Sequence, residues 1–145
     1  MIRNFEPEDW PEFIRLMHAL HEEGSVSTLR FSEKDMLQSL KRPELFNILA
    51  IDPAGNVVGV CTGWVEKTFF GPDLVAHQHL FYVAPEARGS VYGKELMNAF
   101  ESFARDSGAK EIWVSQATGI QIERTQRLFR ALGFETVGFV ARKAA

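Results

Sequence analysis

The chain has 145 residues, 46% of them hydrophobic and 12% aromatic, which suffices for a single domain over residues 1–145 with its own core. Sixteen Lys and Arg against nineteen Asp and Glu give a net charge of -3 without a basic block, so we expect no nucleic-acid partner. The single Cys61 excludes an internal disulfide, and no apolar run suggests a signal peptide or membrane span. We therefore expect a cytoplasmic protein that does not associate with membranes.

The first half of the chain predicts a strand, two helices and a hairpin. Residues 1–5 predict a short strand, and "PEDWPEFIRLMHALHEE" carries apolar residues at the spacing of one helical face. After the polar connection "GSVSTLRF", Ser32 is a candidate N-cap for a second helix that ends before Pro43. Residues 46–70 predict two strands joined at the turn "DPAGN".

The second half predicts a long strand, then two helices that alternate with strands. "LVAHQHLFYVA" is the strand, and the next helix ends at Gly108. "EIWVSQA" predicts a further strand, an amphipathic helix ends at Gly133, and "FETVGFVA" predicts a last strand. The expected order is β-α-α-β-β-β-α-β-α-β, which is an α/β fold.

The turn in "YVAPEARGSVYGKELMNAF" joins a strand to a helix N-terminus, where backbone N–H groups lack internal partners. Gly89 and Gly93 allow close approach of the backbone to phosphate oxygens, and Arg88 and Lys94 add positive charge. The alternative is that these glycines serve only helix packing. The segment has neither the Walker pattern nor the dinucleotide fingerprint.

Three segments together resemble one family. They are "FFGPDLVA" from Phe69, "YVAPEARG" from Tyr82 and "TGIQIERTQRLFRALGF" from Thr118. With the pattern V-x-P-E-x-R-G-x-x-x-G and the final L-G-F, they resemble the GNAT family of N-acetyltransferases, and its small bacterial and phage-type members in particular. The resemblance covers essentially the whole chain and implies the GNAT fold, a mixed, mostly antiparallel sheet flanked by helices.

The resemblance also implies acetyl-CoA as cosubstrate and no metal. The family's pyrophosphate loop and pantetheine-binding strand correspond here to Phe81, Tyr82, Val83, Arg88, Gly89, Ser90, Val91, Tyr92, Gly93 and Lys94. The commoner loop pattern is (Q/R)-x-x-G-x-(G/A), and Val91 replaces its first glycine. We expect binding to survive, because a valine amide still donates a hydrogen bond.

The family often protonates the departing thiolate with a tyrosine four residues before the glycine of "GF". That position is Phe129, for which only contact with the cofactor is expected. Tyr82 is a candidate acid, although a packed strand aromatic is the alternative. Water or a serine would also serve, because a CoA thiolate is a fairly good leaving group.

The candidate bases are His77 and His79, which strand alternation places on one face, with Gln78 on the other. Gln78 stands where close family members tend to carry an acid, and it cannot accept the proton. The alternative for each histidine is a structural, hydrogen-bonded role. A metal role has less support, because no third ligand follows at a fixed spacing.

The family's acceptor pocket corresponds to His21, Glu23, Phe31 and Trp64, although solvated helix-end charges and core aromatics are the alternatives. The leading hypothesis is direct acetyl transfer to a primary amine of a small molecule or peptide. The rivals are a CoA-binding sensor that has lost catalysis and a binder of another nucleotide. Homodimers are frequent in the family, so a homodimer is possible here.

Overall fold

The computed structural model of the chain describes residues 1–24 and 29–145. The polar connection expected between the first two helices therefore falls partly outside the described residues, at 25–28. The helices and strands are β1 Ile2–Asn4, α1 Trp10–Glu23, α2 Glu33–Leu40, β2 Phe46–Ile51, β3 Val57–Lys67, β4 Leu74–Val83, α3 Tyr92–Asp106, β5 Glu111–Trp113 and α4 Ile122–Ala131. Two short 3-10 turns lie at Pro7–Asp9 and Pro85–Ala87. Within the described part, none of the helices is both long and apolar enough to span a bilayer.

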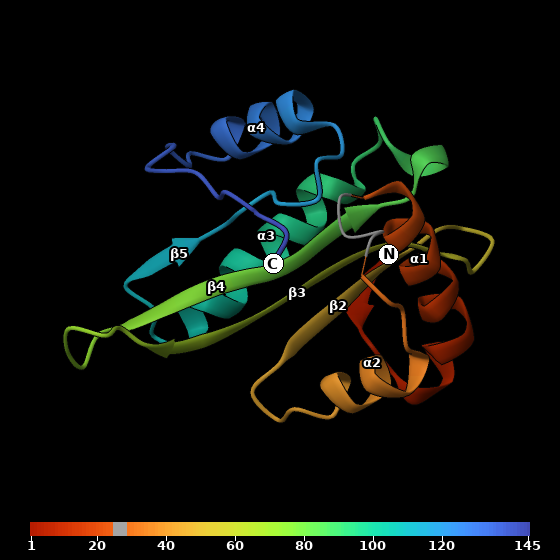
Figure 1. The fold of residues 1–145 in the computed structure, drawn as a ribbon, viewed down its shortest axis with the longest axis horizontal. Coiled ribbons are helices and arrows are strands. Elements are labelled where there is room, and N and C mark those ends of the chain that lie inside the picture. The colour runs from red at the N-terminus through yellow and green to blue at the C-terminus, as the bar shows by residue number, and fades with distance from the viewer. Residues whose placement is uncertain (25–28) are drawn as a thin grey trace.

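The strands form one sheet in the order β1-β2-β3-β4-β5 (Figure 1). The pairs from β1 to β4 are antiparallel, and β5 is parallel to β4. This confirms the expected mixed, mostly antiparallel sheet of an α/β fold.

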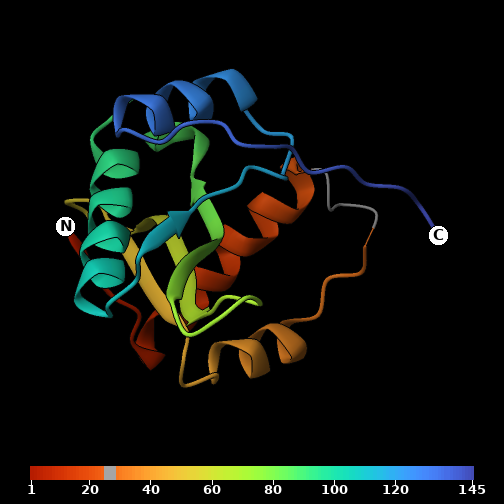
Figure 2. The ribbon, with the colours of Figure 1, turned by 90° about the vertical axis from the view of Figure 1, so that its left-hand side faces the viewer.

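Helices cover both faces of the sheet (Figure 2). The face under α1 carries one buried cluster, which includes Leu16, Leu49 and Val60. The face under α3 carries a second cluster, which includes Cys61 and Phe100. α4 lies at the end of the sheet where β4 and β5 part, so it is placed to border an opening rather than to cover a face.

Two local predictions are confirmed at atomic detail. The Ser32 hydroxyl accepts a hydrogen bond from the Asp35 amide at 3.2 Å, as an N-cap of α2 does. In the β2–β3 turn, Asp52 Oδ1 accepts from the amides of Ala54 at 2.9 Å and Asn56 at 2.8 Å. The side chains of Ser32 and Asp52 thus fix the start of α2 and the β2–β3 turn at the positions that the sequence predicted.

The structure differs from the expected strands near the C-terminus. β5 ends at Trp113 rather than at residue 117, and residues 134–141 form no strand. Val137 and Phe139 in that segment are 68% and 92% exposed. Alternating apolar residues form a strand only beside a partner, and three-residue β5 offers too short an edge.

Gly63 on β3 is needed for close packing of α3 on the sheet. A Cβ at Gly63 would lie 2.5 Å from the His77 carbonyl oxygen and 2.5 Å from Phe100 Cε2. We therefore expect Gly63→Ala to lower the free energy of unfolding by about 2 kcal/mol or more, measured by urea denaturation. Gly71→Ala is the control, because a Cβ there meets nothing within 4 Å. Equal stability of the two variants would contradict the packing argument.

Candidate active site

A cavity of about 580 Å³ lies where β4 and β5 separate. The strands pair only as far as His77 and Trp113, and beyond them the Gln78 side-chain oxygen accepts from the Ser115 amide at 3.1 Å. This side chain takes the place of a backbone partner, so the strands diverge without leaving the Ser115 amide unpaired. The cavity is lined by β4, by the loop after it, by the starts of α3 and α4, and by residues 115–120.

β4 carries a bulge at His79. Thr62 lies opposite Leu80 and Gly63 lies opposite Gln78, so His79 has no partner residue on β3. Bulges of this kind redirect a side chain and often lie beside active sites. His79 is among the residues that line the cavity, and its ring packs against Trp64, with 4.9 Å between ring centroids.

The end of β4 offers free backbone groups to the cavity. The Ala84 amide donates to the Val58 carbonyl at 2.8 Å, and Tyr82 lies opposite Val60. Because bonding directions alternate along an antiparallel strand, the N–H and C=O groups of Phe81 and Val83 face away from β3. The Val83 carbonyl accepts from Arg88 Nε at 2.9 Å, and the Phe81 groups and the Val83 amide form an open edge that an extended ligand can pair with.

The loop after β4 presents unpaired amides to the same cavity. Of the amides from residue 89 to 94, only that of Tyr92 bonds to another described group, the Ser90 hydroxyl at 3.4 Å. No side chain caps the N-terminus of α3, and Gly89 has a φ of 85° that favours glycine. The free N–H groups and the helix dipole together favour an anion here.

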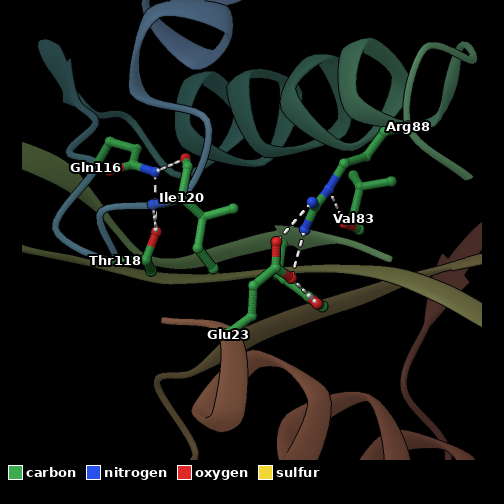
Figure 3. A network of polar contacts seen from close by, with 7 residues as sticks. Glu23, Val83, Arg88, Gln116, Thr118 and Ile120 are labelled. Atoms are coloured by element: carbon green, nitrogen blue, oxygen red, sulfur yellow. Dashed lines mark hydrogen bonds and ion pairs between the residues drawn. The ribbon is translucent and has the colours of Figure 1, made fainter. Parts of the chain in front are cut away.

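Glu23, Tyr82 and Arg88 form one network beside the cavity, and Figure 3 labels Glu23 and Arg88 of it. Arg88 donates to both Glu23 carboxylate oxygens at 2.7 and 2.8 Å, and its Nε donates to the Val83 carbonyl at 2.9 Å. The Tyr82 hydroxyl donates to Glu23 at 2.7 Å. The Arg88 hydrogen bonds hold the pKa of Glu23 below its usual value, whereas burial and the bond to Glu23 raise the pKa of Tyr82.

A second network joins Gln116, Thr118 and Ile120, which all line the same cavity (Figure 3). The Gln116 amide nitrogen donates to the Thr118 hydroxyl at 2.9 Å and to the Ile120 carbonyl. Gln121 follows in the left-handed region, with a φ of 49°, and begins α4 without a side-chain cap. No role was predicted for these residues, although Thr118, Ile120 and Gln121 lie in the "TGIQIERT" segment of the resemblance.

The structure brings most of the expected cofactor and catalytic residues to one cavity. Those that line it are His79, Phe81, Tyr82, Val83, Arg88, Gly89, Ser90, Gly93 and Lys94. Val91, Tyr92, His77 and Phe129 do not line it. His77 lies 3.3 Å from Glu66, and the Phe129 ring packs between Phe81 and Phe134 beside a separate cavity.

The expected acceptor residues lie around this cavity rather than in its wall. The His21 Nε2–H group donates to the Leu29 carbonyl oxygen, and the His21 ring meets Phe31 edge-on. Trp64 supports His79 and carries the Arg42 guanidinium 5.4 Å above its ring. Glu23 is held by Arg88 and Tyr82. Among the described residues, no group of three or more His, Cys, Asp or Glu side chains is arranged to hold a metal ion.

Comparison with known proteins gives one family and one fold. Residues 4–134 match the acetyltransferase (GNAT) family. The structure resembles an acetyltransferase from Trypanosoma brucei, with a TM-score of 0.78 at 19% identity over 100% of this chain and 99% of that one. It also resembles the aminoglycoside N-acetyltransferase AAC(6')-Iy in complex with CoA, with a TM-score of 0.72 at 20% identity over 100% and 98% of the chains.

An aminoglycoside acetyltransferase from an uncultured soil metagenomic sample is similar to the same degree. Its TM-score is 0.77 at 19% identity, over 100% of this chain and 96% of that one. No curated protein matches the chain. At these identities the structural likeness establishes the fold, while the family match covers nearly the whole sequence.

Proposed function

This chain belongs to the acetyltransferase (GNAT) family, and we propose that it transfers the acetyl group of acetyl-CoA to a primary amine of a small-molecule acceptor. One observation carries the proposal. A single cavity joins the open backbone edge of β4 to the unpaired amides before α3. The open edge and the unpaired amides together suit a ligand that has an extended, amide-containing arm at one end and phosphates at the other.

The residues of the cavity fit both the pantetheine arm and the pyrophosphate of CoA. We propose that the N–H and C=O groups of Phe81 and the N–H group of Val83 pair with the pantetheine arm. The amides of Gly89, Ser90, Val91, Gly93 and Lys94 would hold the pyrophosphate. Phe81 and Leu128 contribute apolar residues to the wall of the cavity. The bound thioester provides an acetyl group that is already activated toward amines.

His79 is our proposed base, because it is the candidate histidine that lines the cavity. It takes a proton from the protonated acceptor amine, and the resulting neutral nitrogen forms the new C–N bond at the acetyl carbon. The C–S bond breaks with its electron pair on sulfur, and the second proton that the acylated nitrogen loses passes through water to that sulfur. We propose that Tyr82 anchors Glu23 instead of acting as the acid, since its proton points to that carboxylate.

The function is tested by binding and by turnover. We expect CoA to raise the melting temperature, because a ligand at a hundredfold excess over its Kd stabilises the native state by about 2.7 kcal/mol. A panel of primary amines with acetyl-CoA should then release free CoA thiol for at least one acceptor class. No thermal shift with CoA would refute the proposed cofactor. Binding without thiol release from any amine would instead favour the CoA-binding sensor.

A further inference from the structure

Three cationic side chains line the cavity, those of Arg88, Lys94 and Arg124. Arg88 is already occupied: it makes two bonds to Glu23 and one to the Val83 carbonyl, and its side chain is only 15% exposed. Turning it toward a phosphate would leave the Glu23 carboxylate without its cation. The Glu23 side chain is itself only 31% exposed, so the rearrangement would be unfavourable.

Arg124 extends from the first turn of α4 onto the loop before α3. Its Nη2 atom would lie 3.0 Å from a Cβ on Gly89, so the guanidinium lies close against the Gly89 backbone. Among the described residues, no carboxylate forms an ion pair with Arg124. An uncompensated cation therefore lies directly beside the unpaired amides of residues 89–94.

We propose that Arg124 is the side chain that binds the pyrophosphate of CoA, and that Arg88 is a positioning residue that joins the loop to α1. This inference rests on the proposed function. A guanidinium matches phosphate oxygens with two parallel N–H donors, which suits a diphosphate held on its other side by backbone amides. α4 thus contributes a charge to a phosphate site otherwise built by the β4–α3 loop.

The test compares ligands that differ in their phosphates. Kd values for CoA, dephospho-CoA and pantetheine are measured by titration calorimetry with the full chain and with Arg124→Gln. Dephospho-CoA keeps the pyrophosphate, and pantetheine lacks it. We expect Arg124→Gln to weaken CoA and dephospho-CoA by the same factor, about tenfold, as for one charge-assisted hydrogen bond, and to leave pantetheine unchanged.

Arg127→Gln is the matched control, because Arg127 lies three residues further on α4 and does not line the cavity. It should leave all three Kd values unchanged. Arg124→Lys should restore part of the affinity, since it returns the charge without the paired donors. An unchanged Kd for dephospho-CoA in Arg124→Gln, whether or not CoA weakens, would overturn the assignment. Failure of the unsubstituted chain to bind CoA would instead refute the proposed function.

Discussion

Replacing His79 with glutamine is expected to lower kcat by about 100-fold or more while leaving CoA binding intact. General bases contribute about 10² to 10⁴ in rate, and glutamine keeps most of the side chain's volume without a basic nitrogen. The measurement is steady-state turnover with the acceptor found in the amine panel, together with the CoA-induced thermal shift. Retention of binding separates loss of the base from loss of the fold.

The pH profile gives a sharper readout of the same residue. Partial desolvation of the imidazole, and after it the charge of Arg42, lowers the pKa of His79 from its usual value near 6.5. A lowered pKa keeps the imidazole neutral, and therefore basic, to a lower pH. The acidic limb of kcat/KM should thus lie below about pH 6.5. Arg42→Gln removes one of the two causes and should move that limb to higher pH.

His77→Gln is the matched control, since His77 also lies on β4 but contacts Glu66 and does not line the cavity. It should turn over within a few-fold of the unsubstituted chain at every pH. If His79→Gln is equally active across pH, the imidazole is structural and the amine is deprotonated by another group or by water.

The sequence was sufficient for the order of elements from β1 to α4, though not for the last expected strand, because local signals agree with one another. Ser32 caps α2, Asp52 closes the β2–β3 turn, and the helical faces match the buried clusters. Each of these features depends on residues that are neighbours in the chain. Such patterns survive folding because the tertiary structure reinforces them.

The bulge at His79 was not predicted, because it depends on a register between β3 and β4 that alternation alone cannot show. Alternation suggested that His77 and His79 were equivalent. In the structure they share Trp64 as a neighbour, opposite His77 in the ladder and stacked near His79, yet only His79 reaches the cavity.

The partner of the charged residue Arg88 likewise could not be predicted from local sequence patterns. Its place in a glycine-containing loop suggested a phosphate contact, whereas its partner Glu23 is 65 residues away in the chain. Arg124 is separated from Gly89 by two elements, so no local pattern joined them. The ion pair of Arg88 with Glu23 and the contact of Arg124 with the Gly89 loop could therefore be found only from the structure.

Gly93→Glu is expected to weaken CoA binding by 100-fold or more and to remove the CoA-dependent rise in melting temperature. A Cβ at Gly93 would point among Leu128, Phe81 and Val83, at 3.5, 3.6 and 4.0 Å from their nearest atoms, which are residues of the cavity wall. A glutamate there places a carboxylate near the pyrophosphate. Two like charges about 4 Å apart at a protein surface repel by about 4 kcal/mol, which exceeds the 2.7 kcal/mol of a hundredfold change.

Two further substitutions at Gly93 separate charge from bulk. Gly93→Ala meets its neighbours at ordinary contact distance, so CoA affinity should stay within a few-fold. Gly93→Gln has the size of glutamate without its charge, and it should bind CoA better than Gly93→Glu does. Raising the ionic strength should narrow that difference, because salt screens the repulsion. If Gly93→Glu retains the full CoA-dependent shift while folding normally, the pyrophosphate does not lie at the start of α3, and the cavity must hold the cofactor in another orientation.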